Sequence, residues 1–294
     1  MHRKTVTLLI MVTILISLAC NFSAPAPTPE PPPITVPYPD TLVPPPPLPT
    51  STELIPEVTD TSHPSADTGP LVQLNWFNIN LPSTVANSVQ STVVAVVSSS
   101  DQVAPWEIAP QHEEMTFTGY ILSDTFHVSS INVYPVQDFI AIEPTVADRV
   151  TELQKIIKEK SDNPGNVPIL PLWNAAQVFL SNPVYLDFQN GSGIRYLTQY
   201  GQAIMPINNH DLFYSFQGLT SDGKYWISAI LSVNHPSLQA TYDDPLPADF
   251  EQFMADYEQY TTLLRANLDT QPLETFTPSL ADLDAMISSI VVTH

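Results

Sequence analysis

The fold is decided by Val184-Tyr185-Leu186-Asp187-Phe188, followed by Asn190-Gly191-Ser192-Gly193 and Ile194-Arg195-Tyr196-Leu197-Thr198. Two runs rich in β-branched and aromatic residues flank an Asn-Gly pair, which supplies the positive φ angles of a tight turn. A second pair of runs, 212–216 and 225–231, is joined by Ser221-Asp222-Gly223-Lys224. The two hairpins together predict four sequential antiparallel strands.

Further strands are expected at 115–122, 131–134 and 93–97. Three apolar stripes with helical spacing predict helices at about 145–160, about 248–268 and from Ser279 onward. Thr145 and Asp148 resemble a capping pair for the first helix. Because the apolar face of a sheet needs a cover, we expect an α+β fold, a mostly antiparallel sheet with helices packed on one or both faces.

The order of these expected elements is loosely similar to the αβα sandwich of the PsbP type, a likeness that carries no site residues. The segment 188–236 is also similar to uncharacterised predicted bacterial lipoproteins that share the stalk layout described below. That second resemblance implies no activity.

The N-terminus has the pattern of an export signal. Met1-His2-Arg3-Lys4 precede an apolar run from Thr5 to Ala19, and Cys20, the only cysteine, follows directly. Residues 16–20, Ile-Ser-Leu-Ala-Cys, resemble the bacterial lipobox, which implies cleavage before Cys20 and a diacylglyceryl and an N-acyl group on it. Two or more acyl chains hold a protein firmly at a membrane. We therefore predict a protein anchored outside the cytoplasm, with an uncleaved anchor or a soluble secreted form as alternatives.

Residues 21–70 contain 16 of the 31 prolines, and glycine first occurs at Gly69. Such a segment favours an extended, semi-rigid polyproline II chain, which indicates a spacer rather than a proline-rich ligand. The expected organisation is a signal peptide over 1–19, a lipid anchor and stalk over 20–70, and one extracytoplasmic domain over 71–294.

The charge balance is strongly acidic. Without Arg3 and Lys4 the nine basic residues become seven against 30 acidic ones, so the formal net charge changes from −21 to −23. Nucleic-acid binding needs a basic face, which this composition excludes. The expected partners are the membrane, through Cys20, and an unknown protein or small-molecule ligand.

No motif predicts catalysis, a metal or a cofactor. His112-Glu113-Glu114 lacks the second histidine of a zinc-protease helix and is expected to be a solvated strand entry. Ser192 with His210 and Asp211 is a conceivable nucleophile set, but Gly191-Ser192-Gly193 fits a hairpin tip without the nucleophile elbow. Arg149, Lys155, Lys158 and Lys160 are expected on the solvated face of one helix, with a docking patch for an acidic partner as the alternative.

Four residues are the candidates for a polar and aromatic ligand site: Trp173, Arg195, Asn209 and His210. Arg195 is notable because basic residues are few and a guanidinium orients anions bidentately. The alternative for Arg195 is an ion pair with Asp187 across the hairpin or a solvent-facing position on the strand. For the Asn208-Asn209-His210-Asp211 run the alternative is an ordinary turn. The alternative for Trp173 and Trp226 is that both are packing residues of the core or its edge.

The sequence thus favours a non-enzymatic ligand- or partner-binding module in the cell envelope. A hydrolase whose site is assembled from distant residues, and a structural envelope component, are the alternative functions.

Overall fold

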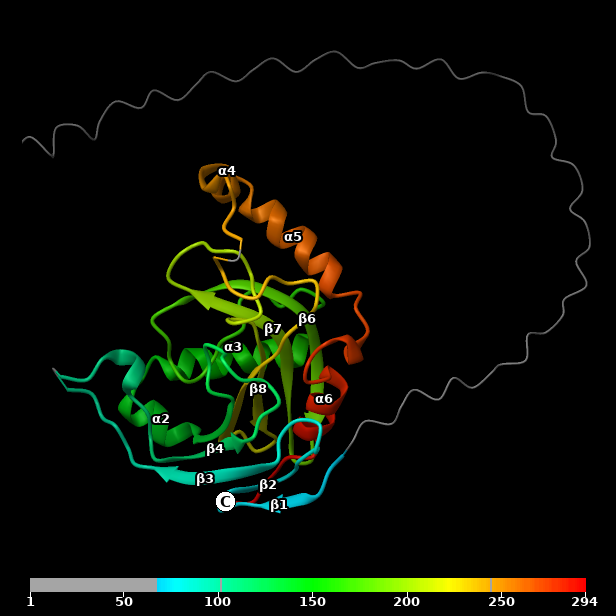
Figure 1. The fold of residues 1–294 in the computed structure, drawn as a ribbon. Helices are drawn as coiled ribbons and strands as arrows, with labels where there is room; N and C mark the ends of the chain where they lie inside the picture. The colour runs from blue at the N-terminus through cyan, green and yellow to red at the C-terminus, as the bar shows by residue number, and fades with distance from the viewer. Residues whose placement is uncertain (1–67, 101, 244) are drawn as a thin grey trace, which may run out of the picture. The chain divides into compact units, whose positions relative to one another are not determined.

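The computed structural model describes residues 68–294, except for Asp101 and Asp244. The lipobox with Cys20 and the stalk up to residue 67 lie outside these described residues. A seven-stranded, wholly antiparallel sheet forms the centre of the described part (Figure 1). In spatial order its strands are β3 (Ser88–Val94), β4 (His112–Thr118), β5 (Ser130–Pro135), β9 (Tyr225–Ser232), β8 (Phe213–Thr220), β7 (Gly191–Gly201) and β6 (Ala176–Phe188). The sheet and the helices on it confirm the α+β fold.

The two predicted hairpins are β6–β7 and β8–β9, and β6 to β9 are adjacent in the sheet as expected. The turn chemistry of the first hairpin was predicted wrongly. Strand β7 already begins at Gly191, so the turn is Gln189-Asn190, and neither of these two residues nor Gly191 has a positive φ. Gly223 in the second turn does have a positive φ, of 72°.

Gly193 is required by close packing rather than by a turn. A Cβ atom there would lie 2.5 Å from the Gln217 carbonyl oxygen and 2.5 Å from the Phe216 ring. The glycines after Asn190 therefore allow β7 and β8 to approach each other inside the sheet, a role that the sequence pattern did not separate from turn formation.

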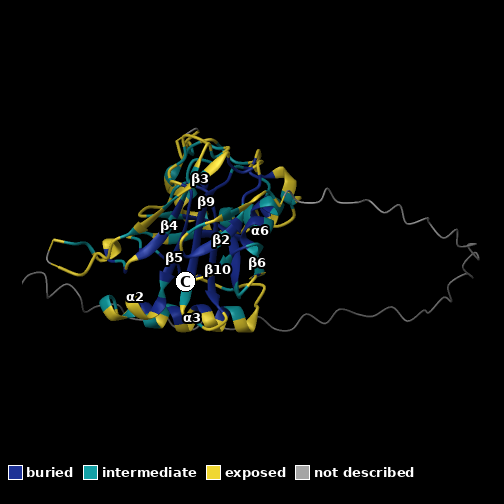
Figure 2. Cartoon of the chain, turned by 90° about the horizontal axis from the view of Figure 1, so that it is seen from below, coloured by how far each residue is buried: buried dark blue, intermediate teal, exposed yellow. Residues whose placement is uncertain are grey.

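Helices α2 (Val136–Ile142) and α3 (Val146–Glu159) cover one face of the sheet. Figure 2 shows their outer sides exposed and their inner sides buried. Phe139 and Leu153 pack there against Tyr196 and Trp226. The capping pair at Thr145 is wrong, because the Thr145 hydroxyl donates to Glu143 Oε1 at 2.6 Å and caps no backbone group of α3.

The opposite face is covered by α6 (Leu280–Ser288) and by a small three-stranded sheet of β1 (Leu71–Gln73), β2 (Phe77–Asn80) and β10 (Val291–Val292). Ser279 caps α6 by accepting from the Ala281 N–H at 3.2 Å. The side chains of Leu280, Leu283 and Ile287 are fully buried, as their spacing predicted. The described part therefore has three layers, with the large sheet in the middle.

The expected helix over 248–268 consists of two helices, α4 (Phe250–Ala255) and α5 (Tyr257–Leu268), separated at Asp256. Two short 3-10 turns, η1 (Pro105–Glu107) and η2 (Leu273–Thr275), complete the elements. Within the part of the chain that is described, no helix combines the length and the apolar character needed to cross a membrane.

Candidate functional site

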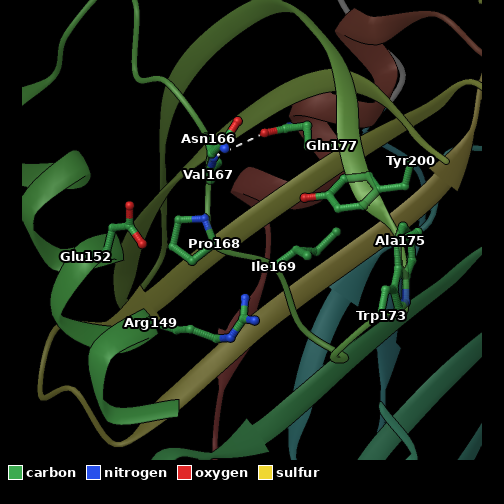
Figure 3. Close-up of a pocket in the computed structure, with 10 residues that line it drawn as sticks. All are labelled: Arg149, Glu152, Asn166, Val167, Pro168, Ile169, Trp173, Ala175, Gln177 and Tyr200. Atoms are coloured by element: carbon green, nitrogen blue, oxygen red, sulfur yellow. Dashed lines mark hydrogen bonds between the residues drawn. The ribbon is translucent and has the colours of Figure 1, made fainter. Parts of the chain in front are cut away.

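A small pocket lies on the sheet face that carries α3, beyond the area that the two helices cover. Its volume is about 170 Å³, smaller than the roughly 300 Å³ from which pockets for drug-sized ligands begin. Helix α3, the connection from α3 to β6, and strands β6 and β7 supply its lining (Figure 3): Arg149, Glu152, Asn166, Val167, Pro168, Ile169, Trp173, Ala175, Gln177 and Tyr200.

The connection that forms one wall of the pocket is fastened to the sheet at Leu170. The Gln217 side-chain oxygen accepts from the Leu170 N–H at 3.3 Å and from Trp226 Nε1 at 2.8 Å. The Ser228 hydroxyl donates to the Leu170 carbonyl, and Gln217 Nε2 donates to Ser228 Oγ at 3.0 Å. Gln217 and Ser228 are fully buried, so this network holds a non-helical segment in place and pairs both backbone groups of Leu170.

A second anchor lies inside the pocket itself. Gln177 Oε1 accepts from the Val167 N–H at 3.3 Å, the bond drawn in Figure 3. Gln177 Nε2 donates to Thr198 Oγ1 at 3.1 Å, and the Thr198 hydroxyl donates to the Phe179 carbonyl at 2.6 Å. The wall is therefore held to β6 as well as to β8 and β9, and Thr198 on β7 orients the Gln177 side chain, which preorganises the pocket.

Aromatic side chains form the other wall. Trp173 stacks on His127 with ring centres 4.9 Å apart and an interplanar angle of 5°. Tyr200 meets Trp173 at 4.8 Å and 87°, and Phe213 meets it at 5.4 Å and 65°. These arrangements are the offset-stacked and edge-to-face geometries that aromatic pairs prefer, so they fix the indole ring.

Burial sets the protonation of the groups in this wall. It raises the pKa of Tyr200 to about 12, against the opposing effects of the nearby Tyr196 hydroxyl and the Arg149 charge. Burial also lowers the pKa of His127 to about 4, while Asp211 acts in the opposite direction. At neutral pH Tyr200 is therefore a hydroxyl donor and His127 an uncharged ring.

Of the four predicted ligand-binding residues, Trp173 lines the pocket and His210 lies near it. Phe126 contacts both His127, at 4.9 Å between ring centres, and His210, at 6.1 Å. His210 Nδ1 is 2.6 Å from Asp211 Oδ1, and Asp211 Oδ2 accepts from Asn208 Nδ2 at 2.9 Å. The Asn208 side chain also accepts from the Asp211 N–H, which makes the expected turn.

Asn209 holds a neighbouring loop. Its amide nitrogen donates to the carbonyls of His235 and Leu238 at 3.1 Å each, and its oxygen accepts from the His235 N–H at 2.8 Å. The nitrogen and the oxygen of the Asn209 side-chain amide are thus both used within the fold, away from the lining of the pocket.

Arg195 lies on the opposite face of the sheet, under α6. Its guanidinium binds Asp284 through Nε and Nη2, at 3.1 and 3.2 Å, and Nη1 donates to Asn182. The residue is 1% exposed, so the expected solvent-facing position is wrong. The expected pair with Asp187 is wrong, because Asp187 is opposite Ser192 in the register while Arg195 is opposite Val184.

Two other constellations considered from the sequence do not form. Ser192 and Tyr200 lie eight residues apart along β7, about 26 Å at strand spacing, and His210 follows the far end, so Ser192 and His210 are separated. Glu113 is fully buried rather than solvated, and its carboxylate accepts from the Asn75 and Trp76 N–H groups at 2.9 and 2.6 Å. Among residues 68–294, apart from 101 and 244, no group of three His, Cys, Asp or Glu could hold a metal ion.

A comparison of the chain with protein-family models, with curated proteins and with solved structures finds no match. Arg149, Glu152, Gln177 and Tyr200 were missed as site residues. The pattern of α3 placed Arg149 on a solvated face, and only the position of the connection 160–175 makes it part of a pocket.

Proposed function

We propose that the chain is a lipid-anchored cell-envelope protein whose folded domain binds a small ligand in the Trp173 pocket without transforming it. The anchor rests on the lipobox resemblance at Cys20 and the spacer on the proline-rich residues 21–70. The binding role rests on the pocket alone.

One observation carries the binding role. The wall of the pocket is an irregular segment that the half-buried Gln177 and the buried Gln217 and Ser228 fasten to strands β6, β8 and β9. Ligand sites are concave, largely preformed, and combine apolar or aromatic walls with a few placed polar groups. Trp173 and Tyr200 supply the aromatic wall here, and Arg149, Gln177 and Glu152 the polar groups.

Thermal unfolding of the full chain with a panel of small amino acids, monosaccharides and carboxylates tests the binding role. A ligand present at about 100 times its Kd stabilises the folded state by about 2.7 kcal/mol. At least one class should raise the Tm of the wild type but not that of Trp173→Ala. The control is Trp106→Ala, which alters an exposed tryptophan outside the pocket and should keep the rise in Tm. Equal shifts in all three proteins, or none in the wild type, would contradict the proposal.

The anchor has its own test. Mass spectrometry of the mature N-terminus should find acylated Cys20 as the first residue. Cys20→Ser should release the protein or leave an uncleaved precursor, and unchanged processing of that variant would overturn the lipoprotein assignment.

The His210–Asp211 pair is the observation that favours the alternative, an extracytoplasmic hydrolase. A histidine oriented by a carboxylate at 2.6 Å is the arrangement of a general base. Activity profiling against ester, glycoside and peptide libraries, with His210→Asn as the comparison, distinguishes the two functions. Turnover that His210→Asn abolishes would replace the binding role.

A further inference from the structure

Arg149 and Glu152 carry opposite charges into one pocket without neutralising each other. They lie three residues apart on α3 and both line the pocket. Within the described residues the ion pairs are Arg195–Asp284, His210–Asp211, Lys224–Asp222 and Arg265–Asp269, so neither pocket residue takes part in one. Figure 3 shows both side chains directed from the helix toward the space around Pro168.

The order of the two residues on the helix is the less favourable one for a direct ion pair. Residues three apart on a helix are neighbours, but an acidic residue before a basic one pairs better than the reverse order found here. Arg149 is only partly exposed, and a partly buried guanidinium without a counter-ion is unfavourable. Glu152 is exposed at the rim of the pocket, so the half-buried Arg149 is the charge that gains most from a ligand, and Glu152 lies where it can contact a second charge on that ligand.

We propose that the ligand is a small zwitterion of amino-acid size, with its carboxylate bound by Arg149 and its ammonium group by Glu152. This inference rests on the proposed binding function and specifies its ligand. A simple anion would meet the Glu152 carboxylate, a simple cation would meet Arg149, and a neutral sugar would leave the guanidinium uncompensated. Only a molecule with both charges satisfies both groups.

The remaining lining fits the same class. The Tyr200 hydroxyl points into the pocket (Figure 3) and keeps its proton at neutral pH, so it can donate a further hydrogen bond to a carboxylate. Pro168, Ile169 and Trp173 give apolar surface for a short side chain. The volume of about 170 Å³ excludes larger peptides from full enclosure.

Isothermal titration of the full chain with free L-amino acids of small side chain tests the proposal. The best of these is compared with its N-acetyl derivative, which lacks the positive charge, and with its amide, which lacks the negative charge. Each blocked form should bind at least tenfold more weakly than the free amino acid. D-Glucose serves as the neutral probe and acetate as the simple anion.

Charge-neutral variants assign each end of the ligand to its residue. Arg149→Gln should weaken the free amino acid at least tenfold while leaving the amide unchanged, and Glu152→Gln should do the same while leaving the N-acetyl form unchanged. Lys155→Gln and Glu159→Gln remove the same charges from exposed positions of α3 outside the pocket. These two variants should leave the affinities for the free amino acid and for its two blocked forms unchanged.

The failure of this inference can be distinguished from the failure of the binding function. One outcome is that the wild type binds glucose or acetate but no amino acid, and that Trp173→Ala abolishes this binding. This outcome overturns the zwitterion proposal and keeps the proposed ligand site. Blocked forms that bind as tightly as the free amino acid also overturn it. No binding of any probe to the wild type overturns both proposals.

Discussion

Arg195 joins the central sheet to helix α6 through a buried guanidinium that is 1% exposed. Asp284 accepts from its guanidinium, and the Tyr214 hydroxyl donates to the same carboxylate at 2.9 Å. Removing one partner of a buried pair costs about 3–5 kcal/mol because the other charge is left uncompensated, whereas replacing both costs less. The pair therefore fixes the position of α6 whatever its net contribution to stability.

We expect Arg195→Met and Asp284→Leu each to lower the free energy of unfolding by about 3 kcal/mol, and the double variant to lose clearly less than the sum. Urea unfolding of the four proteins measures this coupling. Strictly additive losses would show that the two residues act independently.

His127 makes stability depend on pH through the aromatic wall. Burial lowers its pKa from 6.5 to about 4, so the unfolded chain binds a proton between these values that the folded chain does not. The stability that His127 contributes is therefore present above pH 6.5 and is lost as the pH falls toward 4. At 1.36 kcal/mol per pKa unit, the loss is at most about 3 kcal/mol.

His127→Phe, which can keep a ring against Trp173, should reduce the loss of unfolding free energy between pH 7 and pH 4 relative to the wild type. Urea titrations at both pH values give the comparison. His112 and His235, whose pKa values burial also lowers, supply the loss that persists in the variant. An unchanged pH dependence would mean that His127 is not the titrating group.

Among single residues, the sequence identified Trp173 because an aromatic residue beside an asparagine is a recognisable binding pattern. The sequence suggested a ligand site at Arg195 because basic residues are few. This prediction was wrong because the partner of Arg195, Asp284, is 89 residues away in the chain. The sequence also placed Arg149 in solvent, because helical periodicity describes one helix and not the connection that later packs beside it. Contacts between distant segments decide each of these cases.

Substitution of Gly193 tests whether the glycines of the first hairpin are needed for strand packing or for turn formation. In Gly193→Ala the added Cβ would meet backbone and a buried ring at 2.5 Å, and overpacking of this kind costs about 1–3 kcal/mol. Gly165→Ala is the matched control, since its φ of 70° is unfavourable by about 1 kcal/mol but nothing lies within 4 Å.

We expect thermal unfolding to show a larger loss for Gly193→Ala than for Gly165→Ala. A loss at Gly193 no greater than that at Gly165 would indicate that β7 and β8 can separate at this point and that the glycine is not required by their approach.

Hairpins and long amphipathic helices were predictable because their signals are local. The strand over 93–97 was placed too late, since β3 is Ser88–Val94, and α2 was not predicted. The small sheet was missed because its strands have three, four and two residues, too short for periodicity to register. Strand β10 also pairs with β2 from the other end of the chain, which no local pattern indicates.

For the molecule as a whole, the three-layer arrangement separates two functions of buried polar groups. On the α6 face they form the Arg195–Asp284 and Glu113 contacts, which join layers. On the α3 face Gln217, Ser228 and Gln177 hold an irregular segment and so shape a pocket. The first set belongs to the stability of the fold, and the second set positions the candidate site.

The acidic balance gives a prediction for the whole chain. With 30 acidic residues against nine basic ones, compaction brings like charges together, and this self-repulsion opposes folding. Raising the ionic strength from 0.01 to 0.15 M shortens the Debye length from about 30 to about 8 Å. We expect the free energy of unfolding to rise by on the order of 1 kcal/mol, which is the size of a single interaction between two close charges in water.

Urea unfolding at increasing NaCl concentration measures this rise. The same titration at pH 4, close to the ordinary pKa of carboxylates, should show a smaller rise because fewer carboxylates are charged. A salt effect of equal size at both pH values would mean that ion-specific solvation, and not charge repulsion, is being measured.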